Sequence, residues 1–462
     1  MCVLHEDASL RRDDLVAIQK WPRVGLSVIA MARATIVFAS IFVLGSRAVA
    51  LEPATGAAGR LYAQDAATTQ GLQNLRSAIK DKFGEATPPP PAAASKTMSK
   101  DIHFGMVAAM TGPAKELGTQ MKVGITSAFD AANDSGGVNG QAVKLDALDD
   151  GYDPTRTLEQ VKKLHDSGVV GLIGDVGTPT AAAVLPFALE HKMLFFGAFS
   201  GANLLRRDPP DRYVLNYRAS YAEETDATVV YLVKVRRLKP EQIVVFAQQD
   251  SFGDSGYEGV ETAVRALGGK SGTTRLNYQR NTVDVGDAVA ALAKHKGVKA
   301  VVMVATYRAA AKFIEKTRDL YPDLIYTNVS FVGSSALAEE LKLLGPKYAE
   351  GVIVTQVVPD PYGFSSLALE YRSAVAKYFP SEAADYVSFE GYVDGRIMIE
   401  ALKRAGSSPD SEKLVETMEG IHDLEIGLGV PIGFGVGEHQ AIHKVWGTRL
   451  DGSGHFLPIG LK

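Results

Sequence analysis

The sequence predicts an α/β protein built from two doubly wound lobes, and three observations support this fold class. From Asp101 onward, short apolar runs of strand length alternate with amphipathic helical patterns. Several runs are nearly continuous in Val, Ile, Leu and Phe, as expected of parallel strands covered on both faces. The 462-residue chain is too long for one compact domain. Alternation of this kind predicts βαβ units with right-handed crossovers.

The composition excludes several classes of protein. Hydrophobic residues make up 46% of the chain and charged residues 22%, which is typical of a globular protein. The formal net charge of −4 provides no broad basic surface for nucleic acid. We therefore exclude a collagen, a coiled coil, a mostly disordered chain and a polytopic membrane protein.

The first 50 residues have the pattern of a cleavable export signal. An apolar run at 34–44 follows Arg33 and precedes Ala48-Val49-Ala50. This run is shorter than the roughly 20 residues of a membrane-spanning helix, and a basic flank with an A-x-A end is typical of a secretory signal. With Met31 as the start and cleavage after Ala50, residues 1–30 are either an extended basic region or a misassigned start. The alternative is a buried core helix. Export predicts a periplasmic location.

The segment between this signal region and the folded part is expected to be a linker. Residues 51–100 are poor in large apolar side chains and include four consecutive prolines at 88–91, which favour an extended spacer. A short amphipathic helix is possible at 70–83. The single cysteine, Cys2, would be removed with the signal. This excludes disulfides, Cys nucleophiles and Cys metal sites from the exported chain.

The strands and helices alternate in order along the chain. Helical patterns carry apolar residues three or four apart, such as Ile125 and Phe129. The predicted strands are 102–110, 143–148, 169–173, 193–199, 243–247, 300–305 and 352–358. The predicted helices are 121–133, 155–167, 180–191, 222–234, 256–267, 285–295, 308–320 and 367–378.

Ligands of doubly wound sheets bind where strand ends meet helix starts. In the first half, the third strand is followed by 174–180 and the fourth by 199–203, which carry the hydroxyls of Thr178, Thr180 and Ser200. Two helix starts side by side suit an anionic group such as a carboxylate. The alternative is that these hydroxyls are plain helix caps.

An acidic pair follows the second strand. Of Asp149 and Asp150, we expect one to cap a turn and the other to face solvent.

The strand ends of the second half add aromatic side chains. They read Gln248 to Gly253, then Thr306-Tyr307-Arg308, then Gly333-Ser334-Ser335. A cleft lined by hydroxyls together with Phe199, Phe252 and Tyr307 would hold a small amphipathic ligand. Alternatively, Phe252 and Tyr307 only pack one lobe against the other.

Signatures of catalysis and of metal binding are weak. The sequence has no G-x-S-x-G, no G-x-x-x-x-G-K-[ST] and no H-E-x-x-H. His439 and His443 are four residues apart, but their surroundings favour a loop followed by a strand, which would separate them by about 13 Å. We predict no catalytic residue, no metal and no cofactor, and hence no enzyme.

A set of short motifs, taken together, resembles the periplasmic solute-binding proteins of ABC importers, and in particular the branched-chain amino-acid-binding (Leu/Ile/Val) type. The resemblance covers 101–462. The motifs are Thr-Gly-Pro at 111–113, Gly-Gly-Val-Asn-Gly at 136–140, Leu-Asp-Asp-Gly-Tyr-Asp-Pro at 148–154, Gly-Thr-Pro-Thr at 177–180, Gly-Ala-Phe-Ser-Gly-Ala at 197–202, Gln-Asp-Ser-Phe-Gly at 249–253 and Ser-Phe-Glu-Gly-Tyr at 388–392.

The resemblance implies a periplasmic binding protein fold of type I, with two lobes joined by three hinge crossings. We place the crossings near Ser220, Val358 and Gln440. Lobe 1 then consists of 101–220 and 359–440, and lobe 2 of 221–358 and 441–462.

The resemblance also implies a set of ligand-binding residues. In the family, a hydroxyl after the third strand holds the ligand carboxylate, the turn after the fourth strand helps, and aromatic residues of the other lobe cover the ligand. The corresponding positions here are Gly177, Thr178, Phe199, Ser200, Gly201 and Phe252, with Thr306 or Tyr307 as the second aromatic position.

One position departs from the family pattern. The place expected to hold the acidic residue for a ligand ammonium group holds Ser335. A buried ammonium without a carboxylate partner is costly. Either Asp175, Asp250 or Glu390 takes this role, or the ligand is not an ordinary α-amino acid and an aromatic or aliphatic carboxylate fits better.

The sequence thus predicts a non-catalytic binding protein that captures a small carboxylate-bearing ligand by hinge closure and delivers it to an ABC permease. We expect a monomer that binds no nucleic acid. A ligand-sensing subunit of a signalling system on the same fold is the alternative. An exported hydrolase is disfavoured because no nucleophile–base pair is visible.

Overall fold

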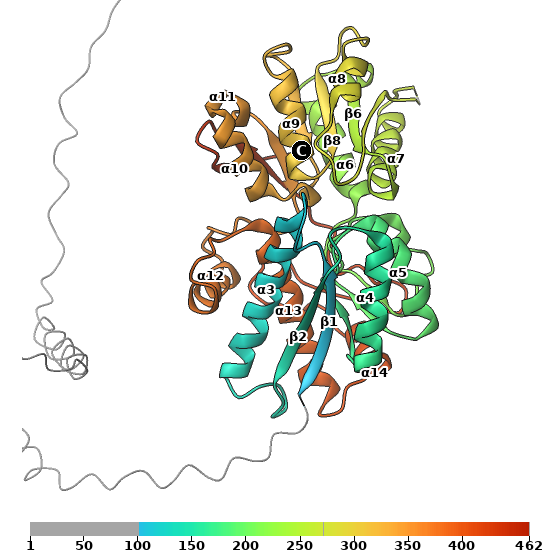
Figure 1. Ribbon diagram of the computed structural model, residues 1–462, viewed down its shortest axis with the longest axis vertical. Coiled ribbons are helices and arrows are strands. Elements are labelled where there is room, and N and C mark those ends of the chain that lie inside the picture. The colour runs from blue at the N-terminus through green and yellow to red at the C-terminus, as the bar shows by residue number, and fades with distance from the viewer. Residues whose placement is uncertain (1–100, 271, 462) are drawn as a thin grey trace, which may run out of the picture. The chain divides into compact units, whose positions relative to one another are not determined.

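The computed structural model describes residues 101–461 except Ser271 (Figure 1). The signal region at 1–50, the linker at 51–100 and the possible helix at 70–83 lie outside the described residues. The described chain forms two lobes, each with its own sheet, so the predicted fold class is confirmed.

The first sheet is parallel throughout and lies in lobe 1, with the strand order β2-β1-β3-β4-β5. Its strands are β1 (Ile102–Ala108), β2 (Val143–Asp149), β3 (Gly171–Ile173), β4 (Leu194–Phe196) and β5 (Val214–Leu215).

Helices cover both faces of this sheet, which explains its apolar strands. α3 (Lys115–Asp134) and α13 (Tyr386–Ala405) cover one face, with α12 (Ser366–Tyr378) packed outside α3 (Figure 1). α4 (Pro154–Ser167) and α5 (Thr178–Glu190) cover the other, and α14 (Ser411–Glu419) packs beside β4.

The second sheet lies in lobe 2, in the order β12-β11-β10-β9-β8-β6-β7. Five strands are parallel, and an antiparallel hairpin of β11 and β12 closes one edge. The strands are β6 (Ile243–Gln248), β7 (Arg275–Tyr278), β8 (Ala300–Val304), β9 (Ile325–Asn328), β10 (Ile353–Gln356), β11 (Trp446–Leu450) and β12 (Phe456–Ile459).

The helices of lobe 2 also form two layers. On one face lie α6 (Tyr221–Val230), which continues as a π-helical turn over Tyr231–Val235, and α7 (Ser251–Ala266). On the other lie α8 (Gly286–Leu292), α9 (Tyr307–Thr317), α10 (Ser334–Leu344) and α11 (Pro346–Ala349). Short 3₁₀ turns occur at Asn203–Leu205, Pro240–Gln242 and Ser330–Val332.

All seven predicted strands and all eight predicted helices are present, with shifted ends. The strand predicted at 193–199 is confined to β4 because Gly197 adopts a φ of +62° and ends it. The helix predicted from residue 121 begins at Lys115. The elements that the sequence analysis missed are β5, β7, β9, β11, β12, α10, α11, α13 and α14.

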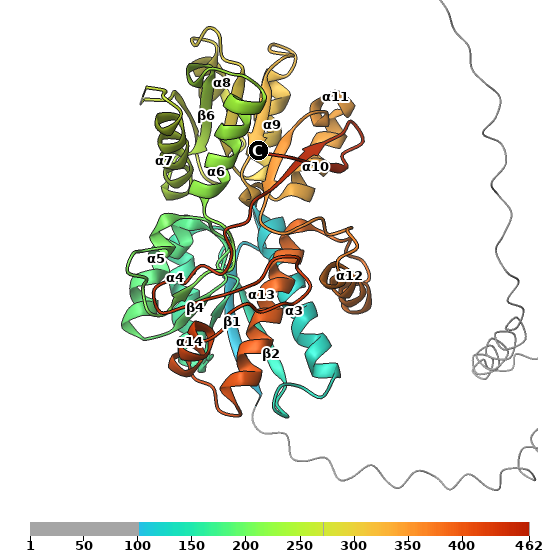
Figure 2. The ribbon, with the colours of Figure 1, turned by 180° about the vertical axis from the view of Figure 1, so that it is seen from behind.

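Three segments connect the sheets and lie side by side. The backbone N–H of Ala441 donates to the Asn216 carbonyl (2.8 Å), and that of Ile442 donates to the Tyr217 carbonyl (3.1 Å). The Tyr217 hydroxyl donates to the Val357 carbonyl (2.9 Å). Figure 2 shows the last crossing in red, running from α14 to the second sheet. The residues at which one lobe gives way to the other stay a prediction.

Within 101–461, no helix is long and apolar enough to cross a membrane.

Candidate functional site

The site begins where β3 and β4 of lobe 1 end, because the loops that follow them stay paired. Val176 and Phe199 form a parallel bridge, the Phe199 N–H donates to the Asp175 carbonyl (2.8 Å), and the Gly177 N–H donates to the Phe199 carbonyl (3.2 Å). This pairing places Thr178 next to Ser200, with their hydroxyl oxygens 2.8 Å apart and both side chains buried.

The hydroxyls of Thr178 and Thr180 are not ordinary helix caps. The N-cap of α5 is Gly177, at a φ of +113°, and no side chain caps this end. The Thr180 hydroxyl donates to the carbonyls of Val176 (2.6 Å) and Gly177 (2.9 Å) instead of accepting from an N–H. The plain-cap interpretation is therefore wrong for Thr178 and Thr180.

The turn after β4 is fixed against the start of lobe 2. The Tyr221 N–H donates to the Gly201 carbonyl (2.7 Å), and a Cβ on Gly201 would lie 2.6 Å from the Tyr221 ring. Burial raises the pKa of Tyr221 to about 12, and its hydroxyl lies beside that of Thr178. Gly201 is thus required for the close approach of the two lobes.

Aromatic side chains from both lobes gather next to the hydroxyl pair. Phe331, in the turn after β9, lies at the centre, with its ring centroid 4.5 Å from that of Phe252 and 5.2 Å from that of Phe199. Tyr152 and Tyr221 complete the cluster, at 6.3 and 6.4 Å from Phe331. All five rings are buried.

A hydrogen-bonded chain of polar groups connects this aromatic cluster to the strand ends of lobe 2. The Gln248 Nε2 donates to the Tyr152 hydroxyl across the lobes (3.2 Å). The Gln248 Oε1 accepts from the Tyr278 hydroxyl (3.0 Å), which in turn accepts from the Thr306 N–H (3.0 Å). Thr306 therefore takes part in this series of hydrogen bonds through its backbone N–H.

Tyr307 and Ser335 lie at a different place, on the wall of a cavity of about 900 Å³ between the lobes. The predicted site residues thus form two groups. Phe199 and Phe252 belong to the aromatic cluster and Gly177, Thr178, Ser200 and Gly201 lie beside it, whereas Tyr307 and Ser335 face the cavity.

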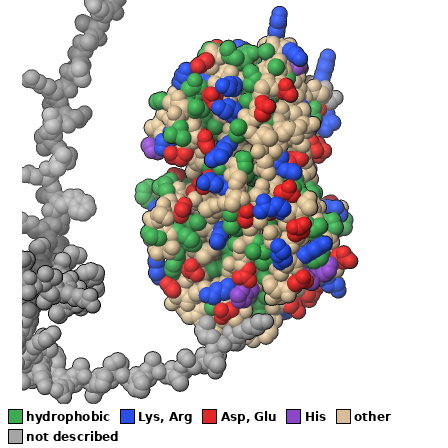
Figure 3. Space-filling view, in the orientation of Figure 1, with side chains coloured by type: hydrophobic (Ala, Val, Ile, Leu, Met, Phe, Trp, Pro, Cys, Tyr) green, Lys and Arg blue, Asp and Glu red, His purple; other side chains and the backbone are tan. Residues whose placement is uncertain are grey.

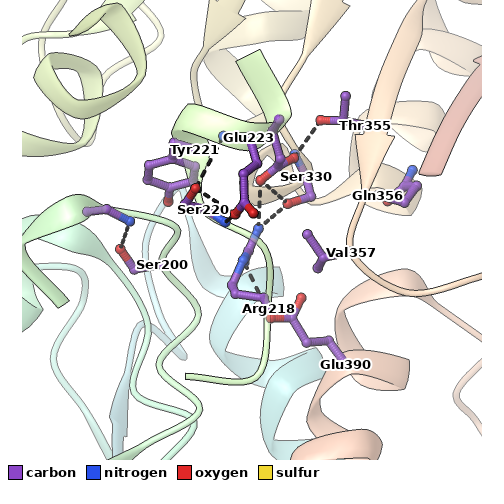
Figure 4. A network of polar contacts seen from close by, with 12 residues as sticks. Ser200, Arg218, Ser220, Tyr221, Glu223, Ser330, Thr355, Gln356, Val357 and Glu390 are labelled. Carbon is purple, nitrogen blue, oxygen red and sulfur yellow. Dashed lines mark hydrogen bonds and ion pairs between the residues drawn. The ribbon is translucent and has the colours of Figure 1, made fainter. Parts of the chain in front are cut away.

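A buried ion cluster joins the lobes at the first hinge crossing (Figure 4). Arg218, 1% exposed, forms ion pairs with Glu224 of α6 (3.2 Å) and Glu390 of α13 (3.4 Å). Its guanidinium lies 4.8 Å from the centroid of the Phe199 ring and also bonds the Ser330 hydroxyl.

Glu224 connects this cluster to lobe 2. It accepts hydrogen bonds from the Ser330 N–H (2.7 Å) and the Thr355 hydroxyl (2.5 Å). One guanidinium therefore faces two carboxylates. Burial raises the pKa of Glu390 to about 7, although Arg218 opposes the shift.

Of the three acidic residues considered for a ligand ammonium, two already have ion-pair partners, and the third has a backbone donor on one oxygen only. Asp250 forms an ion pair with Arg280 (3.3 Å) and caps α7, and Glu390 pairs with Arg218. The Asp175 Oδ1 accepts from the Val107 N–H (2.8 Å), and burial raises the pKa of this carboxyl. Each thus has a structural role in lobe 1, in lobe 2 or at the hinge.

The acidic pair after β2 agrees with its prediction in part. Asp150 is fully buried and accepts from the Tyr152 N–H (2.7 Å) and the Thr157 hydroxyl (2.8 Å). Asp149 accepts from the Met110 N–H (2.7 Å), and its side chain is 27% exposed. The expected turn cap is confirmed, because Asp150 accepts from the N–H two residues further along the chain. Asp149 is only partly exposed and holds the loop after β1 instead of pointing freely into solvent.

The two histidines also have partners within the fold. His439 is buried and contacts the Val214 carbonyl (2.8 Å) and Glu419 (3.2 Å), and His443 contacts Glu223 (2.7 Å). Over the described part of the chain, no group of three or more His, Cys, Asp and Glu side chains is placed to hold a metal.

Sequence reasoning missed several members of the site: Tyr152, Arg218, Tyr221, Glu224 and Phe331. Phe331 follows β9, a strand that was itself not predicted, so the search of strand ends did not reach it. Tyr221 was within reach, because Ser220 and Glu223 form the capping box that starts α6. Arg218 had no signal in the sequence.

Comparisons with known proteins agree with this geometry. The family model described as "Periplasmic binding protein" matches residues 101–455. The Leu/Ile/Val-binding protein homolog 3 of Brucella melitensis is 24% identical over 332 residues, which cover 71% of this chain and 86% of that protein. The Leu/Ile/Val-binding protein BraC3 of Rhizobium johnstonii shows the same identity and coverage.

Solved structures show the same fold. A possible leucine/isoleucine/valine-binding protein from Rhodopirellula baltica superimposes with a TM-score of 0.75 at 39% identity, over 82% of this chain and 99% of that one. A Thermus thermophilus branched-chain amino acid ABC transporter structure with bound valine has a TM-score of 0.69 at 18% identity, over 78% of this chain and 96% of that one. The chain therefore belongs to the periplasmic binding protein family, in which its similar relatives are named Leu/Ile/Val-binding proteins.

Proposed function

We propose that this solute-binding protein works outside the cytoplasm, captures a small carboxylate-bearing ligand, an amino acid or a related organic acid, and delivers it to an ABC permease. The observation that carries this proposal is the Thr178–Ser200 hydroxyl pair at the start of α5. Two hydroxyls and the free N–H groups of a helix start are donors suited to a carboxylate.

The opposite lobe supplies the cover for such a ligand. Phe252 and Phe331 come from lobe 2 and pack against Phe199 and Tyr221 beside the hydroxyl pair. A ligand bound there would contact both lobes. It would therefore bind the closed arrangement more tightly than the open one and shift the equilibrium towards closure. Capture by hinge closure follows from contacts of this kind.

A thermal-shift screen against branched-chain amino acids, aliphatic carboxylates and aromatic carboxylates tests the proposal. A ligand at about 100-fold its Kd stabilises the folded state by about 2.7 kcal/mol, which raises the melting temperature. We expect at least one of these classes to produce such a shift. The absence of a shift with every class would contradict the proposed ligand chemistry.

A Thr178→Ala variant tests the residue directly. Loss of a hydroxyl that bonds a charged carboxylate should weaken binding by about 1.5–3 kcal/mol, measured by isothermal titration calorimetry. Thr317→Ala is the matched control, because Thr317 is equally buried and its hydroxyl bonds Tyr326 in lobe 2. The control should lower the melting temperature without changing the affinity. Equal affinities in wild type and Thr178→Ala would remove Thr178 from the site.

A further inference from the structure

A second pocket, of about 390 Å³, lies in lobe 2 and is separate from the cavity between the lobes, with which it shares no lining residue. It lies where β9 and β10 begin and β11 ends. Because the carboxyl ends of the parallel strands face the crossings, this is the end of lobe 2 that lies away from lobe 1. Figure 3 shows Lys and Arg side chains in blue at this upper end of the molecule.

Three arginines line this pocket. Arg236 follows the π-helical turn after α6, Arg318 follows α9, and Arg449 lies on β11. The acid on the same wall is Asp323. Among the described residues, none of these four side chains forms an ion pair. The pocket therefore carries an excess of positive charge that the described part of the fold does not neutralise.

Arg318 is the arginine that the fold holds most firmly. Its Nη2 donates to the Glu350 carbonyl (3.2 Å), and its guanidinium lies 4.5 Å from the centroid of the Tyr326 ring. Its Nε is buried and has no hydrogen-bond partner, and burial lowers the pKa of this side chain. A cation that is partly buried without a counter-ion is costly. An anion in the pocket would offset this cost, at a guanidinium that is already in position.

Two neighbouring segments add exposed cations around the pocket. They are 234–239, which precedes β6, and 293–299, which precedes β8, and neither segment contains an acid. The Lys299 N–H donates to the Gln242 carbonyl (2.8 Å), and the Ile325 N–H donates to the Lys299 carbonyl (2.9 Å), so the strand starts lie side by side. Six exposed side chains of these segments form no ion pair with any described residue: Lys234, Arg237, Lys239, Lys294, Lys296 and Lys299.

We call these six side chains and the three arginines of the pocket the basic tip. Glu241, Asp323 and Glu350 lie among them without an ion pair, so the tip keeps a clear excess of positive charge although the whole chain has a net charge of −4. Guanidinium groups match the geometry of phosphate oxygens through paired hydrogen bonds. A small free anion would fill the pocket and leave the surrounding lysines unpaired, whereas a surface with many phosphates would engage both.

We propose that the basic tip binds the surface of an anionic phospholipid membrane, with the phosphate of one head group in the pocket of Arg236, Arg318 and Arg449. The lysines around the pocket then face the neighbouring head groups. This inference goes beyond the proposed function, because it involves no residue of the cleft between the lobes and needs no ligand there. Such binding would keep the protein at the membrane that holds its proposed permease.

Cosedimentation with vesicles tests the proposal on the full chain. The vesicles consist of phosphatidylcholine alone or of phosphatidylcholine mixed with phosphatidylglycerol, and calorimetry with inorganic phosphate tests for a free anion. The three double variants, all at exposed positions, are Arg236→Gln/Arg449→Gln in the pocket, Lys296→Gln/Lys299→Gln around it, and the matched control Lys162→Gln/Lys163→Gln on α4 of lobe 1. Residues 1–100 are the same in every variant, so differences between variants report on the exchanged side chains.

We expect the wild type to prefer the vesicles that contain phosphatidylglycerol, and this preference to weaken as salt is added. The pocket variant and the lysine variant should each bind these vesicles more weakly, by about fivefold for every charge removed. The control on α4 should bind like the wild type.

Three results would overturn the inference. The first is equal binding of the wild type to both kinds of vesicle. The second is an equal loss in the control on α4, or a loss confined to the lysine variant, which would remove the phosphate from the pocket. The third is calorimetric binding of inorganic phosphate without any preference for phosphatidylglycerol, which would assign the pocket to a free anion.

Discussion

At the scale of single residues, Arg218 is the side chain that joins the two lobes. Its guanidinium is buried and forms ion pairs with Glu390 of lobe 1 and Glu224 of lobe 2. Figure 4 shows Arg218 and Glu390 side by side at this crossing. Removing one member of a buried ion cluster leaves an uncompensated charge, which costs about 3–5 kcal/mol. The hinge therefore depends on this cluster being complete.

The raised pKa of Glu390 gives this cluster a defined pH dependence. The folded pKa is about 7 and the ordinary value is 4.5. Between these values the native state binds the proton and the unfolded state does not, so the free energy of unfolding falls as pH rises through this window. Because Gln cannot titrate, we expect the free energy of unfolding of Glu390→Gln to fall less steeply with pH, measured by urea denaturation between about pH 4.5 and 7.

Glu400→Gln is the control on the same helix, because Glu400 is a partly exposed residue that pairs with Arg404 (3.0 Å). It should leave the slope of stability against pH unchanged. An unaltered slope in Glu390→Gln would contradict the role of burial at that carboxyl.

The sequence allowed only part of the site to be predicted at this scale. Residues at strand ends, such as Thr178, Ser200 and Phe252, could be located because topology places strand ends together. The ion pair of Arg218 with Glu390 could not be predicted, because it joins a hinge and a helix that lie far apart in sequence. Which acid faces Ser335 likewise depends on how closely the lobes approach.

At the scale of elements, the pair α3 and α13 is the main packing contact of lobe 1, and glycines make it possible. A Cβ on Gly391 would lie 2.5 Å from the Met121 carbonyl oxygen, and one on Gly395 would lie 2.6 Å from the Ala128 Cβ. The two helices can therefore pack with their backbones almost in contact.

We expect Gly395→Val to destabilise the protein by about 1–3 kcal/mol, since overpacking forces the helices apart. Gly406→Val, at the open C-terminal end of the same helix, is not a suitable control because its φ is +91°. Ala401→Gly serves better, because it changes helix propensity at a buried position without adding volume and should cost only about 1 kcal/mol. Equal losses for the two variants in urea denaturation would contradict the overpacking argument.

Element prediction succeeded where periodicity was plain and failed where function or burial disturbs it. α4 has a clear apolar stripe and a proline start after Asp153, so its bounds were nearly correct. α13 is buried on nearly all sides and contains Glu390, Asp394 and two glycines, so it lacks an amphipathic pattern. β12 contains Pro458, which edge strands tolerate but sequence patterns penalise.

At the scale of the whole molecule, the two sheets point the carboxyl ends of their parallel strands at each other across the three crossings. This arrangement explains why the aromatic cluster and the cavity both draw residues from two lobes. The alternation of apolar runs and helices, with the chain length, predicted two doubly wound lobes, whereas the three crossings were implied by the family resemblance. The closed packing of Phe331 against Phe199 was not predictable, because it depends on the angle between the lobes.

Lobe closure around a bound ligand is the central claim, and double electron–electron resonance tests it most directly. Cys2 is the only cysteine, so replacing it by Ser allows spin labels at Glu159→Cys on α4 and Glu258→Cys on α7, both exposed positions in different lobes. The acid or amino acid that gives the largest thermal shift is added. We expect the distance distribution to shift to shorter values, and to do so much less in Thr178→Ala at the same concentration. An unchanged distribution with a ligand that calorimetry shows to be bound would contradict capture by closure.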